Sequence, residues 1–88
     1  MGTLHIVPII GTMQKAISSH DYRRLVEWLK HARLAHGWSM RELASKIDEP
    51  HSFVQKVEWM ERRLDVYEFV QYCRALEIDP HEALDFFD

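Results

Sequence analysis

Histidine and cysteine are the residue types in this chain that could bind a metal ion or transfer protons. There are six histidines and one cysteine: His5, His20, His31, His36, His51, His81 and Cys73. A zinc site needs ligands at close, recognisable spacing with help from cysteine or carboxylate groups, and no interval here forms such a motif. Cys73 lies in an apolar helical pattern, which indicates a buried, unreactive thiol. We therefore expect no metal site and no cofactor.

The residue sets that catalysis requires are also missing. The sequence has no glycine-rich phosphate loop and no local Cys/His or Ser/His/Asp arrangement. A chain of 88 residues also leaves little room for a deep pocket. The three tryptophans are expected to serve packing. We expect a protein that is not an enzyme and that acts by binding.

Hydrogen bonding from one face of a short helix is the chemistry that residues 50–58 could perform. Phe53, Val54 and Val57 are spaced to face a core. The polar side chains between them face outward, and these are His51, Ser52, Gln55 and Lys56. Histidine can donate to N7 or O6 of guanine, glutamine can pair with adenine, and lysine can reach guanine or phosphate. Such a helix is suited to reading base edges in the major groove.

Two helices are expected ahead of this one. The first spans about Ser19–His36, and Gly37 supplies the left-handed position that ends it. The second starts at Ser39, because Ser39 and Glu42 form a capping box. It stops before Pro50, since the residue that precedes a proline avoids the helical region. Pro50 then stands at or beside the first position of the third helix.

Two further helices are expected after residue 64. A second capping box, formed by Asp65 and Glu68, begins the fourth helix. Its apolar stripe consists of Val66, Phe69, Val70, Cys73 and Leu76. The fifth helix has Asp79 as its cap and Pro80 at its first position, and its stripe consists of Ala83, Leu84 and Phe87, with Phe86 off that stripe. The sequence therefore predicts an all-α fold in which five helices form one domain over residues 19–88.

The N-terminal residues 1–18 are expected to form an extended arm outside the helical domain. Residues 3–10 are rich in β-branched side chains and indicate a strand, which Pro8 confines to a sheet edge. Because no second strand is evident, this strand either pairs with its copy in another subunit or packs across the helices. The candidate dimer contacts are Leu4, Ile6 and Ile9 in the arm, and Phe86 and Phe87 at the other end of the chain.

The charge is unevenly distributed. Residues 23–63 hold nine Lys/Arg against six acids, whereas residues 64–88 hold seven acids and Arg74 alone. The middle of the chain is therefore positive although the whole chain has a net charge of −3. Affinity for phosphate depends on the local field of the docking face, so this balance permits nucleic-acid binding. No apolar run could span a membrane and no signal peptide is evident, which predicts a cytoplasmic location.

From Leu29 to Leu84 the chain resembles the lambdoid phage-repressor and Cro family, also called Xre-type helix-turn-helix proteins. The similarity rests on many short matches in order, which are Ser39, Glu42-Leu43-Ala44, Ser52 with Lys56 and Glu58, Arg62-Arg63-Leu64, and Ala75-Leu76 with Pro80. The resemblance implies a DNA-binding transcription regulator, most simply a repressor, whose third helix (about residues 50–59) enters the major groove of a double-stranded operator.

The resemblance also implies roles for individual residues. His51, Ser52, Gln55 and Lys56 would face the bases. The residues near the phosphate backbone would be Ser39, Met40, Arg41, Arg62 and Arg63. Arg33 in the first helix would form an ion pair with Glu58 at the end of the third. The chain departs from the family pattern at Asp48 and Met60, where glycine is usual, so either the third helix runs longer or its turn is rebuilt.

Two functions are compatible with these sequence features. A homodimeric transcription regulator is favoured, because one such domain covers too few base pairs to select a site in a genome. The alternative is a protein-interaction module of the same fold, such as an antitoxin or an assembly partner. The acidic C-terminal part of the chain, Glu49 and Trp59-Met60 would be suited to that role.

Overall fold

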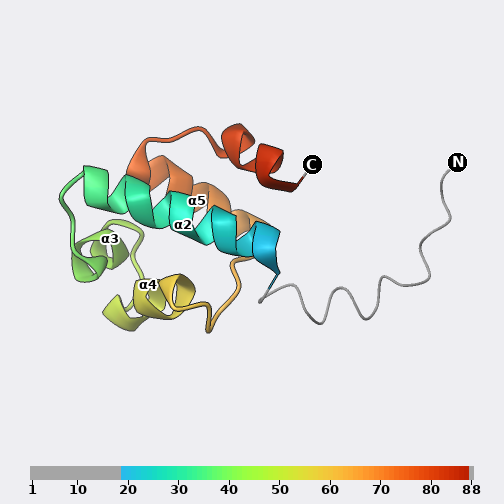
Figure 1. The fold of residues 1–88 in the computed structure, drawn as a ribbon. Coiled ribbons are helices and arrows are strands. Elements are labelled where there is room, and N and C mark those ends of the chain that lie inside the picture. Colours follow the sequence, from blue (N-terminus) through green and yellow to red (C-terminus); the bar gives the residue numbers. More distant parts are fainter. Residues whose placement is uncertain (1–18, 88) are drawn as a thin grey trace, which may run out of the picture.

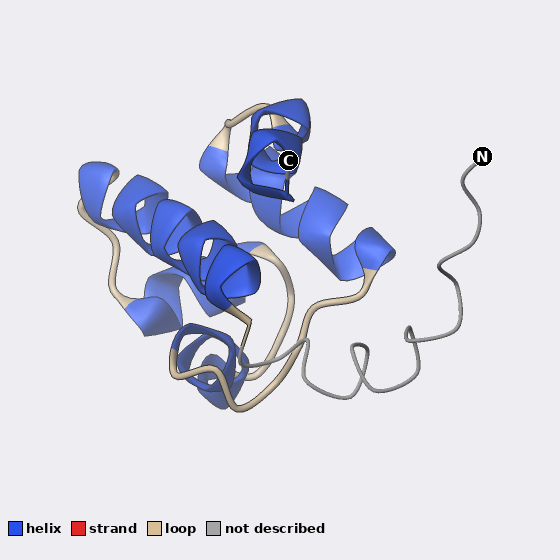
Figure 2. Ribbon diagram, turned by 45° about the vertical axis from the view of Figure 1, so that its right-hand side comes forward, coloured by secondary structure: helices blue, strands red, loops and turns tan. Residues whose placement is uncertain are grey.

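The structure, a computed structural model, describes residues 19–87, which form five helices and contain no strand (Figure 1). In chain order these are α2 (His20–Ala35), α3 (Met40–Lys46), α4 (His51–Glu58), α5 (Val66–Leu76) and the 3₁₀ helix η3 (Pro80–Phe87). Figure 2 shows the same arrangement coloured by element type. The expected all-α fold with five helices is confirmed. The expected N-terminal strand or arm, residues 1–18, lies outside the described residues.

Side-chain caps begin three of these helices where the sequence predicts them. The Ser19 hydroxyl accepts a hydrogen bond from the Tyr22 N–H at 3.0 Å at the start of α2. Ser39 with Glu42, and Asp65 with Glu68, form complete capping boxes at the starts of α3 and α5. Each box satisfies backbone N–H groups that have no partner inside the helix. Local sequence therefore fixes where these helices begin.

The four described α-helices end in the same hydrogen-bonding pattern. At the end of α2 the Gly37 N–H donates to the Leu34 carbonyl at 2.9 Å, and the Trp38 N–H donates to the Arg33 carbonyl at 3.2 Å. These two bonds are those of a Schellman motif, whose turning residue is left-handed. Gly37 has φ 76°, and the corresponding residues after α3, α4 and α5 are Asp48, Met60 and Glu77, with φ of 58°, 66° and 60°.

One core joins the helices. Its fully buried members come from α2, α3, α4 and α5, and the largest are Tyr72, Leu29, Leu43, Leu76, Val26, Val54, Val57 and Cys73. α2 contacts α4, α5 and η3, and α3 packs against α4 (Figure 1). Burial raises the pKa of the Cys73 thiol to about 11, which keeps it protonated near neutral pH. None of the described helices is long and apolar enough to cross a membrane.

The expected apolar stripe of the last helix is wrong at Leu84 and Phe87. Ala83 is buried, but Leu84 is 62% exposed and Phe87 is 48% exposed. The side chain that packs inward is Phe86, whose ring meets that of Trp28 edge-on with a centroid distance of 6.0 Å. The reason is the helix type. η3 is a 3₁₀ helix with three residues per turn, so residues 83 and 86 share a face, whereas an α-helix would group 83, 84 and 87.

The expected stripe of α5 is also wrong at its first position. Val66 is 79% exposed, and Tyr72, which lies outside the expected stripe, is fully buried. Val66 is the first residue of α5, directly after the capping residue Asp65, so its side chain projects beyond the region that the other helices cover. Cys73 and Leu76 are buried as expected.

Candidate nucleic-acid interface

α4 divides its side chains between the core and solvent. Phe53, Val54 and Val57 are buried. On the other side His51 and Lys56 are exposed, and Ser52 and Gln55 are half-buried. Residues three or four positions apart lie near one another on a helix surface, and each of these polar side chains has such a neighbour in the set, so the four share one face. We call this set (His51, Ser52, Gln55 and Lys56) the polar face of α4. Figure 1 shows α4 at the edge of the domain, away from η3.

Trp59 extends the polar face of α4, although the sequence pattern alone assigned all three tryptophans to packing. It directly follows α4 and is 58% exposed. Its position four residues after Gln55 and three after Lys56 places it near them on the helix surface. The other two tryptophans pack against neighbouring rings, Trp28 on Phe86 and Trp38 stacked on His36 at 4.1 Å. Helical spacing from Gln55 was the signal that could have distinguished Trp59.

A buried ion pair fixes α4 to α2. The structure brings Arg33 and Glu58 together, with Arg33 Nε 2.7 Å from Glu58 Oε2 and the second guanidinium nitrogen 2.9 Å from Oε1. The two side chains are 7% and 2% exposed. The third guanidinium nitrogen donates to the Trp38 carbonyl at 2.8 Å. Because two parallel bonds fix the pair's geometry, Arg33 sets the position of the end of α4 relative to α2 and the turn after it.

The turns on either side of α4 keep the geometry that glycine usually supplies. After α4 the Met60 N–H donates to the Val57 carbonyl at 3.1 Å, and the Glu61 N–H donates to the Lys56 carbonyl at 2.8 Å. These bonds form a Schellman motif with methionine in the left-handed position. A left-handed residue with a β-carbon costs about 1–2 kcal/mol. Of the two possibilities at this point, the turn is rebuilt: α4 ends at Glu58, and Met60 adopts the left-handed backbone conformation that glycine usually has.

A second ion pair joins the loop after α4 to α5. Arg62 donates two hydrogen bonds to the Glu68 carboxylate, at 2.8 and 2.7 Å, and its guanidinium lies over the Phe53 ring, 4.7 Å from the centroid. Phe53 lies near the start of α4, so this contact fixes the helix at the other end from Glu58. The family resemblance implied a phosphate contact for Arg62, and nothing in the sequence indicated this pairing, because Glu68 already serves the capping box and its second role depends on the path of the loop.

The Arg62 contact predicts a specific loss of stability in acid. It lowers the pKa of Glu68 below its ordinary value of 4.5. Because the pKa of Glu68 is lower in the folded protein than in the unfolded chain, its contact stabilises the native state at pH values above the pKa of the unfolded chain. This stabilisation is lost as the pH falls through the pKa of the folded protein. We expect Glu68→Gln, which keeps a capping acceptor, to lower the melting temperature at pH 7 by a few degrees, about 1 kcal/mol or less because Arg62 is 40% exposed.

Thermal melts from pH 7 down to pH 3 test this expectation. The difference between the parent protein and Glu68→Gln should shrink below pH 4.5, as Glu68 becomes protonated. Glu61→Gln, a change at an exposed position in the same loop, is the matched control and should show no such convergence. A melting difference that stays constant over this range would contradict a charged Arg62–Glu68 contact.

The other residues assigned to phosphate differ in their exposure and contacts. Arg41 and Arg63 are exposed. The Ser39 side chain is occupied in the capping box, where it accepts from the Glu42 N–H at 3.0 Å, and Met40 packs against the core. The exposed Lys46 lies over the Trp38 ring, 4.5 Å from its centroid.

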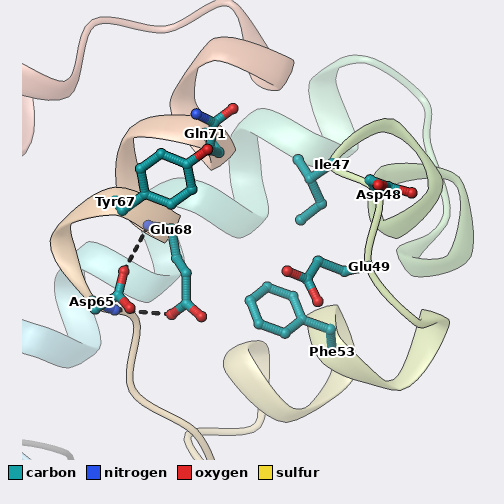
Figure 3. A pocket seen from close by; sticks show the side chains of 8 residues that line it. All are labelled: Ile47, Asp48, Glu49, Phe53, Asp65, Tyr67, Glu68 and Gln71. Carbon is teal, nitrogen blue, oxygen red and sulfur yellow. Dashed lines mark hydrogen bonds between the residues drawn. The ribbon is translucent and has the colours of Figure 1, made fainter.

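A polar pocket of about 400 Å³ lies beside α4 but has the wrong charge for phosphate. It includes the carboxylates of Asp48, Glu49, Asp65 and Glu68. In Figure 3 the side chains of Glu49 and Phe53 face that of Glu68 across the pocket. Arg62 neutralises the charge of Glu68, but the other three carboxylates remain, so the lining of the pocket carries excess negative charge. This pocket is therefore not a candidate phosphate site, whereas the polar face of α4 has no comparable group of carboxylates. The described residues contain no cluster of His, Cys, Asp or Glu that could hold a metal ion.

Known proteins share this arrangement. A family profile described as helix-turn-helix matches residues 29–82. Among solved structures, an XRE-family like protein from Pseudomonas syringae pv. tomato is 42% identical with a TM-score of 0.72, covering 83% of this chain and 89% of that one. The restriction-modification controller protein C.AhdI from Aeromonas hydrophila is 28% identical with a TM-score of 0.65, covering 72% and 91%. No curated protein sequence matches the chain.

The matched region contains the elements described above. It begins at Leu29, includes the Arg33–Glu58 pair and the whole of α3, α4 and α5, and ends within η3. The profile covers more than half of the chain, and the Pseudomonas protein is similar in both sequence and fold. The chain therefore belongs to the Xre-type helix-turn-helix family of DNA-binding transcription regulators.

Proposed function

We propose that this protein is a sequence-specific transcription regulator, most simply a repressor, that places α4 in the major groove of a double-stranded operator. The observation that carries the proposal is the polar face of α4, whose helix is held by the Arg33–Glu58 ion pair at its end and by the contact of Arg62 with Phe53 near its start. A fixed, protruding helix with donors and acceptors on its outer face is what direct reading of base edges requires. Acting on DNA in this way, the protein would work in the cytoplasm.

Base contacts and phosphate contacts fall to different residues in this proposal. His51, Ser52, Gln55 and Lys56 contact base edges, and exposed Trp59 lies against the groove wall at the end of the same face. Arg41 and Arg63, with the Ser39–Met40 start of α3, lie along the phosphates. Arg62 fixes the position of α4 and contributes to phosphate binding only through its charge, because Glu68 already accepts two of its hydrogen bonds.

The regulator acts as a homodimer. One α4 reads only a few base pairs, and two copies about a two-fold axis would read half-sites roughly 34 Å apart. The sequence offers two dimer contacts, one in the N-terminal segment and one at Phe86 and Phe87. Phe86 packs against Trp28, so it is not free to meet a partner. Leu4, Ile6 and Ile9 in the N-terminal segment are therefore the favoured contact, with Phe87 as the alternative.

A protection assay on the DNA that flanks the protein's own gene tests DNA reading and dimerisation together. We expect two protected half-sites with two-fold symmetry and centres one helical turn apart, and a binding constant that falls steeply with salt. Sedimentation equilibrium at tens of micromolar should give a dimer for the parent and a monomer for Ile6→Asp. A single protected half-site with a monomer in both samples would contradict the dimer.

A protein partner is the second candidate function, and the acidic pocket beside α4 favours it. The carboxylates of Asp48, Glu49 and Asp65 could accept a cationic side chain. Salt alone does not separate this contact from DNA binding, because both weaken as charges are screened. The decisive result is sequence dependence: a DNA-reading protein distinguishes its operator from scrambled DNA of the same length and composition, whereas a protein-binding module binds both equally or not at all.

A further inference from the structure

An apolar groove lies at the end of the domain where the described chain begins. Leu25, Phe69 and Ala83 form its floor, and Val66, Leu84 and Phe87 form its rim. The rim side chains are 79%, 62% and 48% exposed, although large apolar side chains are normally covered. The groove therefore lies between the start of α2, the start of α5 and the end of η3, and Figure 1 shows these three segments at the same end of the domain.

The size and lining of the groove indicate aliphatic side chains as its occupant. Its volume is about 180 Å³, below the roughly 300–1,000 Å³ of sites that bind small molecules. Among the described residues that line it, Asp65 alone is charged, so no set of polar groups converges there to orient a ligand. A space of this kind accommodates one or two branched apolar side chains of a peptide segment.

We propose that residues 4–10 of the same chain bind in this groove. The segment Leu4-His5-Ile6-Val7-Pro8-Ile9-Ile10 contains the longest aliphatic cluster of the sequence, and it lies outside the described residues. It is the part of this chain whose side chains match an aliphatic groove. The inference is independent of DNA binding, since the groove is formed by η3, α5 and α2 and not by the polar face of α4.

The chain is connected so that the segment can reach the groove. The described residues begin at Ser19, and Leu25 on the groove floor lies within the second turn of α2. α2 rises about 1.5 Å per residue, so Leu25 lies about 9 Å along the helix from Ser19. The residues between Ile10 and Ser19 can span up to about 30 Å when extended. The connection is therefore long enough to turn back onto the groove.

A groove in the same chain is favoured over one in a second copy by effective concentration. A short tether holds a segment near its site at an effective concentration in the millimolar range, far above the micromolar concentration of other copies. The aliphatic side chains of residues 4–10 are thereby assigned to the groove of their own chain, whereas the dimer proposed above assigns the same side chains to a partner. Disulfide trapping distinguishes the two, because it separates a product within one chain from a product between chains.

Disulfide trapping in the full-length chain tests the proposal. The parent's Cys73 is fully buried with a raised thiol pKa, so it does not compete for oxidation. Leu84→Cys is combined in turn with Leu4→Cys, Ile6→Cys or Ile9→Cys, and each double variant is oxidised at low micromolar concentration. Ser45→Cys, on the exposed surface of α3, replaces Leu84→Cys in the control series. Products are separated by non-reducing electrophoresis and identified by mass spectrometry.

We expect at least one Leu84→Cys pairing to form a disulfide within a single chain at least ten times faster than its Ser45→Cys control. Equal rates in the two series would overturn the proposal. A product that links two chains, in preference to one within a chain, would also overturn it and would assign the groove to a second copy. Dimerisation measured by sedimentation is a separate result, so the failure of either proposal is recognised on its own.

Thermal melts provide a second measurement that does not depend on cysteine placement. Leu84→Gln changes a side chain that is 62% exposed in the described domain, so an unoccupied groove would give almost no effect. With the segment bound, this variant should lower the melting temperature by about 4 °C or more. The same change should have no further effect in a chain that already carries Ile6→Gln and Ile9→Gln. Equal effects in both backgrounds would contradict binding of the segment at Leu84.

Discussion

Replacing Arg33 with alanine is expected to lower the free energy of unfolding by about 3–5 kcal/mol, the largest effect expected of a single change in the two ion pairs. The substitution leaves the Glu58 carboxylate 2% exposed and without its partner, and it leaves the Trp38 carbonyl without its donor. A small domain has a total stability of about 5–15 kcal/mol. Arg33→Ala should therefore melt tens of degrees lower, and it should lose DNA binding through the displacement of α4.

Two comparison variants make this expectation sharp. Arg23→Ala removes an exposed arginine from the same helix and should change the melting temperature little. Arg33→Met combined with Glu58→Leu removes both charges, so it should recover part of the stability that Arg33→Ala loses. Thermal unfolding followed by circular dichroism measures all three. If Arg33→Ala proved no less stable than Arg23→Ala, the buried pair would not hold α4 in place.

Replacing Gln55 and Lys56 with alanine is expected to abolish most of the preference for the operator over unrelated DNA. A well-formed contact from a side chain to a base edge contributes about 1–3 kcal/mol of discrimination, which corresponds to about 5- to 150-fold for each residue. Lys56 is exposed and Gln55 half-buried, and both lie on the side of α4 opposite Phe53, Val54 and Val57. The double variant should therefore fold and melt almost as the parent does.

Arg63→Ala is the matched variant for phosphate binding. Phosphate contacts position the protein without carrying sequence information, so this change should weaken binding to operator and scrambled DNA by the same factor. Fluorescence anisotropy with both DNA sequences, at one fixed salt concentration, gives the binding constants needed for each variant. An unchanged ratio of operator to scrambled affinity in the Gln55→Ala, Lys56→Ala protein would refute the assignment of the polar face of α4.

Capping chemistry is the part of the fold that sequence predicts best. Ser39 with Glu42 and Asp65 with Glu68 place the starts of α3 and α5, because each box depends only on residues three positions apart. The faces of the last two helices were harder to predict. An α-helical period assigns Leu84 and Phe87 to the core, whereas the 3₁₀ geometry of η3 exposes both and turns Phe86 inward. Local spacing does not determine which helix type forms.

The candidate site, like the fold, could be predicted only where it depends on local sequence spacing. The outward side chains of α4 follow from the spacing of Phe53, Val54 and Val57, and the structure places them on one face. The contact of Arg62 with Glu68 and Phe53 depends on how the loop after α4 crosses the domain, which no short-range signal encodes. Sequence therefore identifies the residues that could meet DNA, and the structure shows that Arg62 is also engaged by Glu68 and Phe53.

The three left-handed turns without glycine have a consequence for the denatured chain. Glycine at position 48, 60 or 77 would relax the native backbone, but it would also give the unfolded chain more conformations to lose, by about 0.4–1 kcal/mol. Non-glycine residues at these positions restrict the unfolded chain, and this partly offsets the backbone strain that Asp48, Met60 and Glu77 carry in the folded state. Because the two effects oppose each other, these positions can change between glycine and other residues at small net cost. The angle between α3 and α4 is then preserved by main-chain hydrogen bonding, while the side chains at both ends of α4 remain free to diversify.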